Sequence, residues 1–257
     1  DVLVLAGDIG SYQQGGQLSD EDFGLARFAP QAAGGRWPTP VLFVPGNHEY
    51  DAQDFDEAHQ RLRNTCERLG IAWLERETLV LAGVRFVGTT LWSDFDALAE
   101  HEGTEDLTRQ LRLRDKAYRA ANFYLRKTGG TRHGEPFLAE PMREQALACQ
   151  QWLRSALETP FDGPTVAVTH FAPSLLSADP RYGLVPGTAG FCNALDGLLP
   201  HAQLWLHGHL HAPSDYTVRG THAATGQPWQ CRVVANPLGY ARKGEQATFQ
   251  PRLCITV

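Results

Sequence analysis

Side chains of the kinds that bind metal ions follow four separate apolar segments of this chain. These residues are Asp8, Asn47, His170, His209 and His211. Each comes shortly after a run of residues such as Val and Leu that is typical of a buried strand. Because ligands in open α/β sheets bind at the carboxyl ends of the strands, we expect these side chains to meet at one edge. A carboxylate, an amide and several imidazoles make a ligand set suited to a divalent transition metal.

Taken one at a time, these residues also have plainer interpretations. Asp8 suits a turn or a helix cap, Asn47 after Pro-Gly suits a turn, and His170 suits a hydrogen-bonded core histidine. The segment 207–211 favours metal binding more strongly, since three of its five residues are histidines. The first of them, His207, is expected to support a ligand rather than to be one. The joint arrangement is much harder to explain by chance than any single residue.

The elements that must position these residues follow from hydrophobic periodicity. Strands are predicted at Val2–Ala6, Val41–Val44, Ile71–Leu74, Thr78–Leu81, Val84–Val87, Thr165–Thr169, Gln203–Leu206, Asp215–Val218, Cys231–Ala235 and Leu253–Val257. Helices are predicted over residues 19–34, 54–69, 105–127 and 140–158. Strands alternate with helices early in the chain and crowd together late, which indicates an α/β fold with mixed sheets. No repeat or linker interrupts the pattern, so residues 1–257 are predicted to form a single domain.

Composition and charge exclude several classes of protein. Of the 257 residues, 42% are hydrophobic and 20% are charged, which is an ordinary globular mixture. No apolar run reaches the length of about 18 residues that a membrane span needs, so no membrane partner is expected. The net charge of −6 argues against general binding to nucleic acid. The five cysteines include no C-x-x-C pair, which favours a reduced, cytoplasmic setting over a disulfide framework.

Four short motifs carry a resemblance to a known family. They are Gly7-Asp8, Gly46-Asn47-His48-Glu49, His170 and Gly208-His209-Leu210-His211, each at a predicted strand end. In type and order they resemble the calcineurin-like metallophosphoesterases, and Trp92 and the stretch 236–240 resemble a bacterial branch of that family. The resemblance implies a four-layer α/β/β/α sandwich with two mixed sheets. It also implies a centre of two divalent metal ions, Mn, Fe or Zn, at the strand ends.

The resemblance gives each motif residue a role. Asp8 is expected to bridge the two metals, and His211 is expected to reach the first of them. His48 is expected to face the substrate phosphate as the catalytic residue, without binding metal. The second metal is expected to be completed by Asn47, His170 and His209. The implied activity is that of a metal-dependent phosphoesterase, which hydrolyses phosphomonoester or small phosphodiester bonds of a small phosphorylated substrate by attack of a metal-activated water.

One motif of the family, Asp-x-His, is absent from the chain. Asp1 does not replace it, because seven residues of strand at about 3.3 Å each place it roughly 23 Å from Asp8. Val2–Ala6 is apolar on both faces, so we expect an interior strand and an upstream segment that carries its neighbour and two further ligands. One metal site of the chain as given is therefore expected to be incomplete. The alternative function is a non-catalytic metal-binding or protein-interaction module on the same fold, and the retained His48 argues against it.

A helical cap insertion is predicted over residues 94–140. Residues 109–132 hold eight Lys and Arg against the single acid Asp115, whereas residues 94–106 are acidic. Two interpretations stay open. Either the basic and acidic stretches are solvent-exposed faces that attract each other, or the cations of the cap hold an anionic substrate over the metals. Trp92 and Asp94 are expected to line the same cleft, and for Trp92 a place in the core stays open as an alternative.

Overall fold

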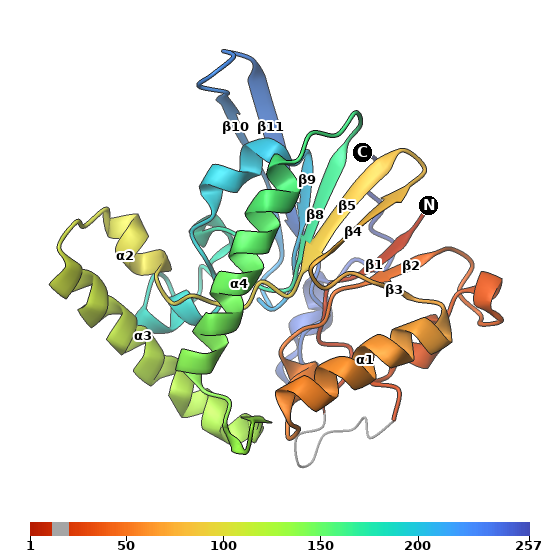
Figure 1. Ribbon diagram of the computed structural model, residues 1–257, viewed down its shortest axis with the longest axis horizontal. Helices are drawn as coiled ribbons and strands as arrows, with labels where there is room; N and C mark the ends of the chain where they lie inside the picture. Colours follow the sequence, from red (N-terminus) through yellow and green to blue (C-terminus); the bar gives the residue numbers. More distant parts are fainter. Residues whose placement is uncertain (12–20) are drawn as a thin grey trace.

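The computed structural model describes residues 1–11 and 21–257, which form two main β-sheets with helices packed against them (Figure 1). The smaller sheet contains β1 (Leu3–Leu5), β2 (Val41–Phe43) and β3 (Ala72–Trp73), all parallel. The larger sheet has the strand order β10-β11-β9-β8-β5-β4. The bounds of these strands, in that order, are Ser214–Thr221, Pro228–Ala235, Leu204–Leu206, Thr165–Thr169, Val84–Thr89 and Glu77–Leu81. Its four central strands are parallel, and β10 and β4 close its edges antiparallel.

Four α-helices and a small hairpin complete the regular structure that is described. The helices are α1 (Phe55–Leu69), α2 (Ala97–Glu102), α3 (Leu107–Thr128) and α4 (Ala139–Glu158), and the hairpin pairs β6 (Thr131–Arg132) with β7 (Glu135–Pro136). Short 3-10 helices span Leu25–Phe28, Gln31–Ala33, His48–Tyr50, Leu175–Ser177, Pro186–Gly190, Asp196–His201, Ala241–Lys243 and Glu245–Thr248. In the described part of the chain, no helix combines the length and the apolar character that crossing a membrane requires.

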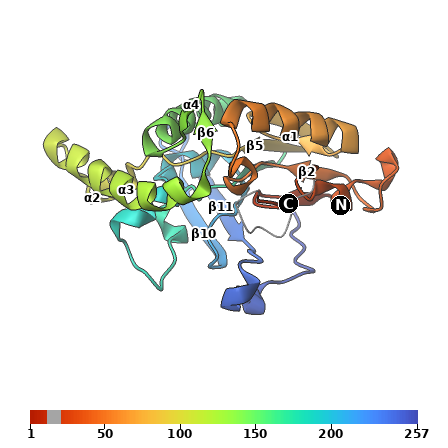
Figure 2. The same cartoon turned by 90° about the horizontal axis from the view of Figure 1, so that it is seen from below.

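The two sheets share an apolar cluster through one face of each. The smaller sheet and its strand ends contribute Leu42, Val44 and Leu74, and the larger sheet contributes Phe86, Val166, Val168, Leu204 and Val234. The other faces pack against helices, α1 on the smaller sheet and α4 on the larger, and Figure 2 shows α1 lying over β2. Each sheet therefore has one face toward the other sheet and one toward a helix, which confirms the predicted α/β/β/α sandwich. Mixed pairing occurs in the larger sheet, whereas both pairs among the described strands of the smaller sheet are parallel.

Local sequence explains why α1 forms where it was predicted. The side chain of Asp54 caps its first turn by accepting hydrogen bonds from the backbone N–H groups of Asp56 and Glu57 at 3.1 and 3.4 Å. Gly70 ends it in the left-handed conformation with φ 68°. Leu62 and Cys66, one turn apart, are fully buried on its inner face. The predicted helices over 105–127 and 140–158 are likewise present as α3 and α4.

Two predicted elements are wrong. Of the helix predicted over 19–34, residues 19 and 20 lie outside the described residues, and the rest forms two short 3-10 helices instead. Gly24 with φ 76° and Pro30 between these helices interrupt a continuous α-helix, since Pro lacks the N–H that the helix needs. The strand predicted at Leu253–Val257 is irregular chain. Its apolar residues Leu253 and Ile255 instead pack against the cluster between the sheets.

The edge of β1 that faces away from β2 carries no strand among the described residues. Residues on both faces of β1 are nevertheless apolar and packed: Leu5 belongs to the core beneath α1, and Val4 packs against the cluster between the sheets. An upstream strand along this edge stays a prediction.

His59 lies on the inner face of α1 and supports the fold rather than the site. Its ring packs edge-on against Trp73 with 5.2 Å between centroids, and its Nδ1 lies 3.0 Å from the Tyr50 hydroxyl. Burial, together with the charges of Arg76 and Arg63, lowers the pKa of His59 to about 4 from its ordinary value of 6.5. The unfolded chain thus binds this proton at higher pH than the folded chain. The stability that neutral His59 contributes is complete above pH 6.5 and is lost as the pH falls toward 4.

Substitution His59→Phe keeps an aromatic ring and removes this titration. Between about pH 7 and about pH 5, we expect the unfolding free energy of the parent to fall by about 1–2 kcal/mol more than that of the variant. Urea denaturation at the two pH values measures the difference. The matched control is His101→Gln at an exposed position of α2, which is expected to keep the slope of the parent. Equal slopes in parent and His59→Phe would contradict this role.

Candidate metal centre

Loops at the ends of three strands bring together three of the predicted ligands. Asp8 follows β1, His170 follows β8 and His209 follows β9, and one ligand atom from each lies within 4.8 Å of the other two. Asn47, which follows β2, joins them through its Oδ1, which lies 3.1 Å from Nε2 of His170. This proximity is the arrangement expected from the sequence, whereas the binding of a metal by these residues stays a prediction.

The donor atoms in this group suit a cation. Nδ1 of His170 lies 2.7 Å from the carbonyl oxygen of Ala6 and donates its proton there. Nε2 of the same ring therefore faces two oxygens, Oδ2 of Asp8 at 3.2 Å and Oδ1 of Asn47 at 3.1 Å. A nitrogen and two oxygens at these distances need a positive charge between them, supplied by a proton or by a metal ion. The neutral amide and imidazoles with one carboxylate are a ligand set that a divalent transition metal accepts.

The charges of the group follow from their mutual contacts. Burial alone raises the pKa of Asp8, but the charges of His170 and His48 and the hydrogen bond from His170 outweigh it and hold that pKa well below its usual range. Burial and the charge of His170 lower the pKa of His209 well below its ordinary value. Asp8 is thus a carboxylate and His209 a neutral imidazole, and these are the forms that bind metal.

Aromatic rings hold His209 in place. Its imidazole stacks against Phe171 with 4.1 Å between centroids and against Phe191 with 4.9 Å. Trp92 packs behind Phe171 at 5.7 Å, is only 3% exposed and belongs to the core, so the core interpretation of this residue is the correct one. Asp94 is also buried, where its carboxylate accepts a hydrogen bond from Gln150 at 2.7 Å.

Glycines allow the loops to approach this closely. A Cβ on Gly46 would lie 2.2 Å from Oδ1 of Asp8 and 2.8 Å from Cε1 of His170. A Cβ on Gly7 would lie 2.4 Å from Nδ1 of His170, and Gly7 also has φ 86°. At Gly7 and Gly46 a side chain would therefore clash with residues of the candidate centre, which explains why both positions are glycine.

Glu49 orients the backbone around the centre. Its carboxylate is fully buried and accepts hydrogen bonds at 2.5–3.2 Å from backbone N–H groups. The donors are Asp8, Ile9, Gly10 and Gly46. Burial and the nearby charge of Asp8 raise the pKa of Glu49 to about 7. Since all four of these partners are backbone groups, Glu49 shapes the loops.

His48 stands beside the ligand group and points its second ring nitrogen outward. Its backbone N–H donates to Oδ1 of Asp8 at 2.9 Å, and its Nδ1 lies 2.6 Å from Oδ2 of Asp51. The hydroxyl of Ser11 donates to the same Asp51 oxygen at 2.7 Å. Burial lowers the pKa of His48, but the charge of Asp8 and the hydrogen bond to Asp51 outweigh it and raise the pKa to about 10. The Nε2 atom lies 3.2 Å from the hydroxyl of Tyr240.

His211 lies outside the group of three ligand atoms. Its Nδ1 lies 2.7 Å from Oε2 of Glu245, and its ring stands edge-on to Tyr240 with 4.5 Å between centroids. His207 is also separate, since its Nε2 lies 2.9 Å from the hydroxyl of Ser177 in the protein interior. The role of His211 as a ligand of another metal stays a prediction.

Sequence reasoning missed two residues that position the site. Asp51 stands three residues after His48, and the 3-10 turn His48–Tyr50 brings both to one side. That spacing was available in the sequence. Glu245 is 34 residues from His211, and no local pattern connects the two.

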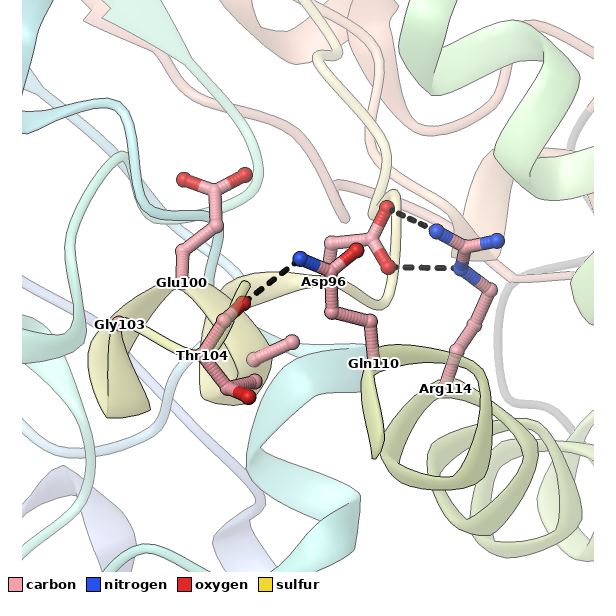
Figure 3. Close-up of a pocket in the computed structure, with 7 residues that line it drawn as sticks. Asp96, Glu100, Gly103, Thr104, Gln110 and Arg114 are labelled. Carbon is pink, nitrogen blue, oxygen red and sulfur yellow. Dashed lines mark hydrogen bonds and ion pairs between the residues drawn. The ribbon is translucent and has the colours of Figure 1, made fainter. Parts of the chain in front are cut away.

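Three of the eight cations of the cap pair with acids of the cap itself among the described residues, namely Arg109, Arg114 and Arg119. Figure 3 shows Arg114 of α3 bound to both carboxylate oxygens of Asp96, at 2.6 and 2.9 Å. These residues line a hollow of about 370 Å³ with Glu100 and Gln110, and none of the predicted metal ligands borders it. Arg109 pairs with Glu102 through a single contact, from its Nε to Oε2 at 2.7 Å. For Arg109 and Arg114 these ion pairs support the interpretation that the basic and acidic stretches attract each other. That residues 94–140 form a separate cap stays a prediction.

Comparisons with known proteins agree with this architecture. A family model described as calcineurin-like phosphoesterase matches residues 1–213. The crystal structure of the phosphopantetheinyl hydrolase from Mycobacterium tuberculosis is similar, with a TM-score of 0.61 and 21% sequence identity, over 100% of this chain and 88% of that chain. At this identity the similarity shows the fold. No curated protein matches the chain.

The contacts of Gly46 generate a test of the centre. Substitution Gly46→Ala forces a methyl group onto the Asp8 backbone and the His170 ring, so we expect metal affinity to fall by about 10–100-fold, the effect of disturbing groups that orient ligands. Titration with Mn²⁺ or Zn²⁺, with circular dichroism to verify folding, measures this. The control is Gly197→Ala, because a Cβ there meets nothing within 4 Å. Unchanged affinity in a folded Gly46→Ala protein would show that the centre is elsewhere.

Proposed function

Because this chain belongs to the calcineurin-like phosphoesterase family, it is a hydrolase of phosphoester bonds, and we propose that it works through a divalent metal held by residues at its strand ends. The residues proposed to hold the metal are Asp8, Asn47, His170 and His209. His48 is the proposed catalytic residue. The proposed substrate is a small phosphomonoester or phosphodiester, and His211 is the proposed contact to a further metal.

One observation carries this proposal. Ligand atoms of Asp8, His170 and His209 lie within 4.8 Å of one another, and His48 is tied to the same Asp8 by its backbone N–H. A metal-binding group and an adjacent imidazole that bonds to none of the ligand side chains are the two parts that phosphoester hydrolysis needs.

The residues around the group have distinct tasks. A divalent ion held there supplies Lewis-acid polarisation of a phosphoryl oxygen and lowers the pKa of a bound water. Oδ2 of Asp8 is offered to the ion, while Oδ1 holds the loop of His48. His48 keeps a proton at Nε2 for the phosphoryl or leaving oxygen, and Asp51 orients the ring and stabilises its charged form through Nδ1.

Less specific observations support the proposed cellular compartment and the choice of substrates to test. All five cysteines are free and four of them are buried, which supports a reducing compartment such as the cytoplasm. The similar solved structure is titled a phosphopantetheinyl hydrolase, so a phosphopantetheine diester belongs among the substrates to be tested. An aryl phosphate and an aryl phosphodiester distinguish the two classes of ester.

Metal content and turnover test the proposal together. We expect the purified chain to bind about one Mn²⁺ or Zn²⁺ ion tightly and to hydrolyse an aryl phosphate or diester slowly, with activity lost on chelation and restored by metal. Elemental analysis and product release measure the two quantities. Tight metal binding without hydrolysis of any of the three substrates would instead favour the non-catalytic metal-binding module.

Two substitutions distinguish the proposed metal-binding role of Asp8 from the proposed proton-donating role of His48. His48→Ala is expected to keep the metal and to lose about 10²–10⁴-fold in turnover, the usual contribution of a general acid–base group. Asp8→Asn is expected to lose the metal as well, because it removes the carboxylate of the ligand group. The control is His133→Ala, which removes an imidazole with 78% of its side chain exposed. Equal metal loss in the His48 and Asp8 variants would contradict their separate roles.

A further inference from the structure

The segment Leu238–Glu245 closes one side of the candidate site with a tyrosine. Tyr240 contacts two motif residues at once, with its hydroxyl 3.2 Å from Nε2 of His48 and its ring 4.5 Å from that of His211. His48 follows the smaller sheet and His211 the larger. Tyr240 is 45% exposed, so part of its side chain is open to solvent.

Tyr240 is held in this position by a set of local contacts. Its backbone N–H donates to Oε2 of Glu245 at 2.8 Å, and the same oxygen lies 2.7 Å from Nδ1 of His211. Gly239 turns the chain with φ 66°, and a Cβ on it would lie 2.6 Å from Cβ of Glu245. Two hydrogen bonds between Asn236 and Gln250, at 2.8 and 2.9 Å, close the base of the segment. The ring is therefore positioned by the fold.

The hydroxyl of Tyr240 occupies the point where His48 would meet a substrate. Nδ1 of His48 is engaged by Asp51 at 2.6 Å, which leaves Nε2 as the nitrogen available to a phosphoryl oxygen. An oxygen of the substrate that binds next to this hydroxyl and shares the Nε2–H of His48 lies within hydrogen-bonding reach of both groups. A hydroxyl both accepts and donates, so Tyr240 bonds to Nε2–H without substrate and turns its O–H to the oxygen when substrate is bound.

We propose that Tyr240 is a second catalytic residue beside His48, whose hydroxyl donates a hydrogen bond to the same phosphoryl or leaving oxygen. This inference rests on the proposed phosphoesterase function. No proton leaves Tyr240: the proton transferred to the leaving oxygen comes from Nε2 of His48, and the tyrosine stabilises the charge that develops on that oxygen. Two residues 192 positions apart in the sequence would thus act on one atom.

Substitution Tyr240→Phe tests the hydroxyl alone, because the ring against His211 is retained. We expect kcat to fall by about tenfold or more, since one preorganised donor is lost, while metal content stays that of the parent. The affinity for inorganic phosphate is expected to weaken by about threefold or more, the lower end of a lost hydrogen bond to a charged group. The Nε2 resonance of His48 in nitrogen NMR is expected to shift, a readout independent of turnover.

A double substitution measures whether the two residues act on one oxygen. In a His48→Ala background, Tyr240→Phe is expected to cost less than in the parent, because partners in one hydrogen-bond network are not additive. The matched control is Tyr124→Phe on α3, another tyrosine, 64% exposed, which is expected to keep the activity of the parent.

The outcomes separate this inference from the proposed function. If the metal-loaded parent hydrolyses none of the substrates, the proposed function fails and this inference with it. If the parent is active and Tyr240→Phe has the same kcat, only this inference is overturned. A rise in kcat/KM in Tyr240→Phe would also overturn it, since the tyrosine would then merely compete with the substrate for His48.

Discussion

The buried carboxylate of Glu49 is the constraint on which the rest of the site depends. Its two oxygens accept backbone hydrogen bonds from three consecutive residues after β1 and from Gly46 after β2. One side chain thus fixes two loops relative to each other. Burial opposes the ionisation of this group, and hydrogen bonds of about 1.5–3 kcal/mol each to its charged form offset that cost only in part, since its pKa is raised to about 7. Because Glu49 is occupied in this way, it shapes the loop of its neighbour His48, whose backbone N–H donates to Oδ1 of Asp8.

Two of the residues at the candidate centre have strained backbone conformations that close contacts hold in place. Asp8 and His209 have φ values of 57° and 63°, although neither is glycine. Such conformations cost on the order of 1–3 kcal/mol each and persist only where surrounding contacts leave no alternative. Gly46 lies so close to Asp8 that a Cβ on it would clash with the Asp8 carboxylate and backbone N. The rings of Phe171 and Phe191 stack against the imidazole of His209. The atoms of Asp8, His170 and His209 that could bind a metal are therefore brought together by the fold of the chain itself.

Local patterns in the sequence predict the part of this arrangement that depends on local physics. Apolar runs place β1, β2, β8 and β9, and the polar residues after them identify Asp8, Asn47, His170 and His209 as neighbours. The pattern fails over residues 21–34, where glycine and proline outweigh a weak helical periodicity. It also fails for Glu245, because a contact with His211 across 34 residues leaves no periodic signal. Asp51 lies between these cases, since only the 3-10 turn at His48 makes a spacing of three meaningful.

The C-terminal segment that contains Tyr240 and Glu245 contacts residues that follow both sheets. His48 follows the smaller sheet and His211 the larger, and their separation depends on how the apolar cluster between the sheets packs. Glu245 and Tyr240 connect the two imidazoles directly through a carboxylate oxygen and a phenol. Leu253 and Ile255, further along, pack on the same cluster. The segment that bridges the two halves of the site is therefore anchored in the interface that sets their distance. The contacts of Tyr240 with His48 and His211 therefore depend on how the two sheets pack against each other.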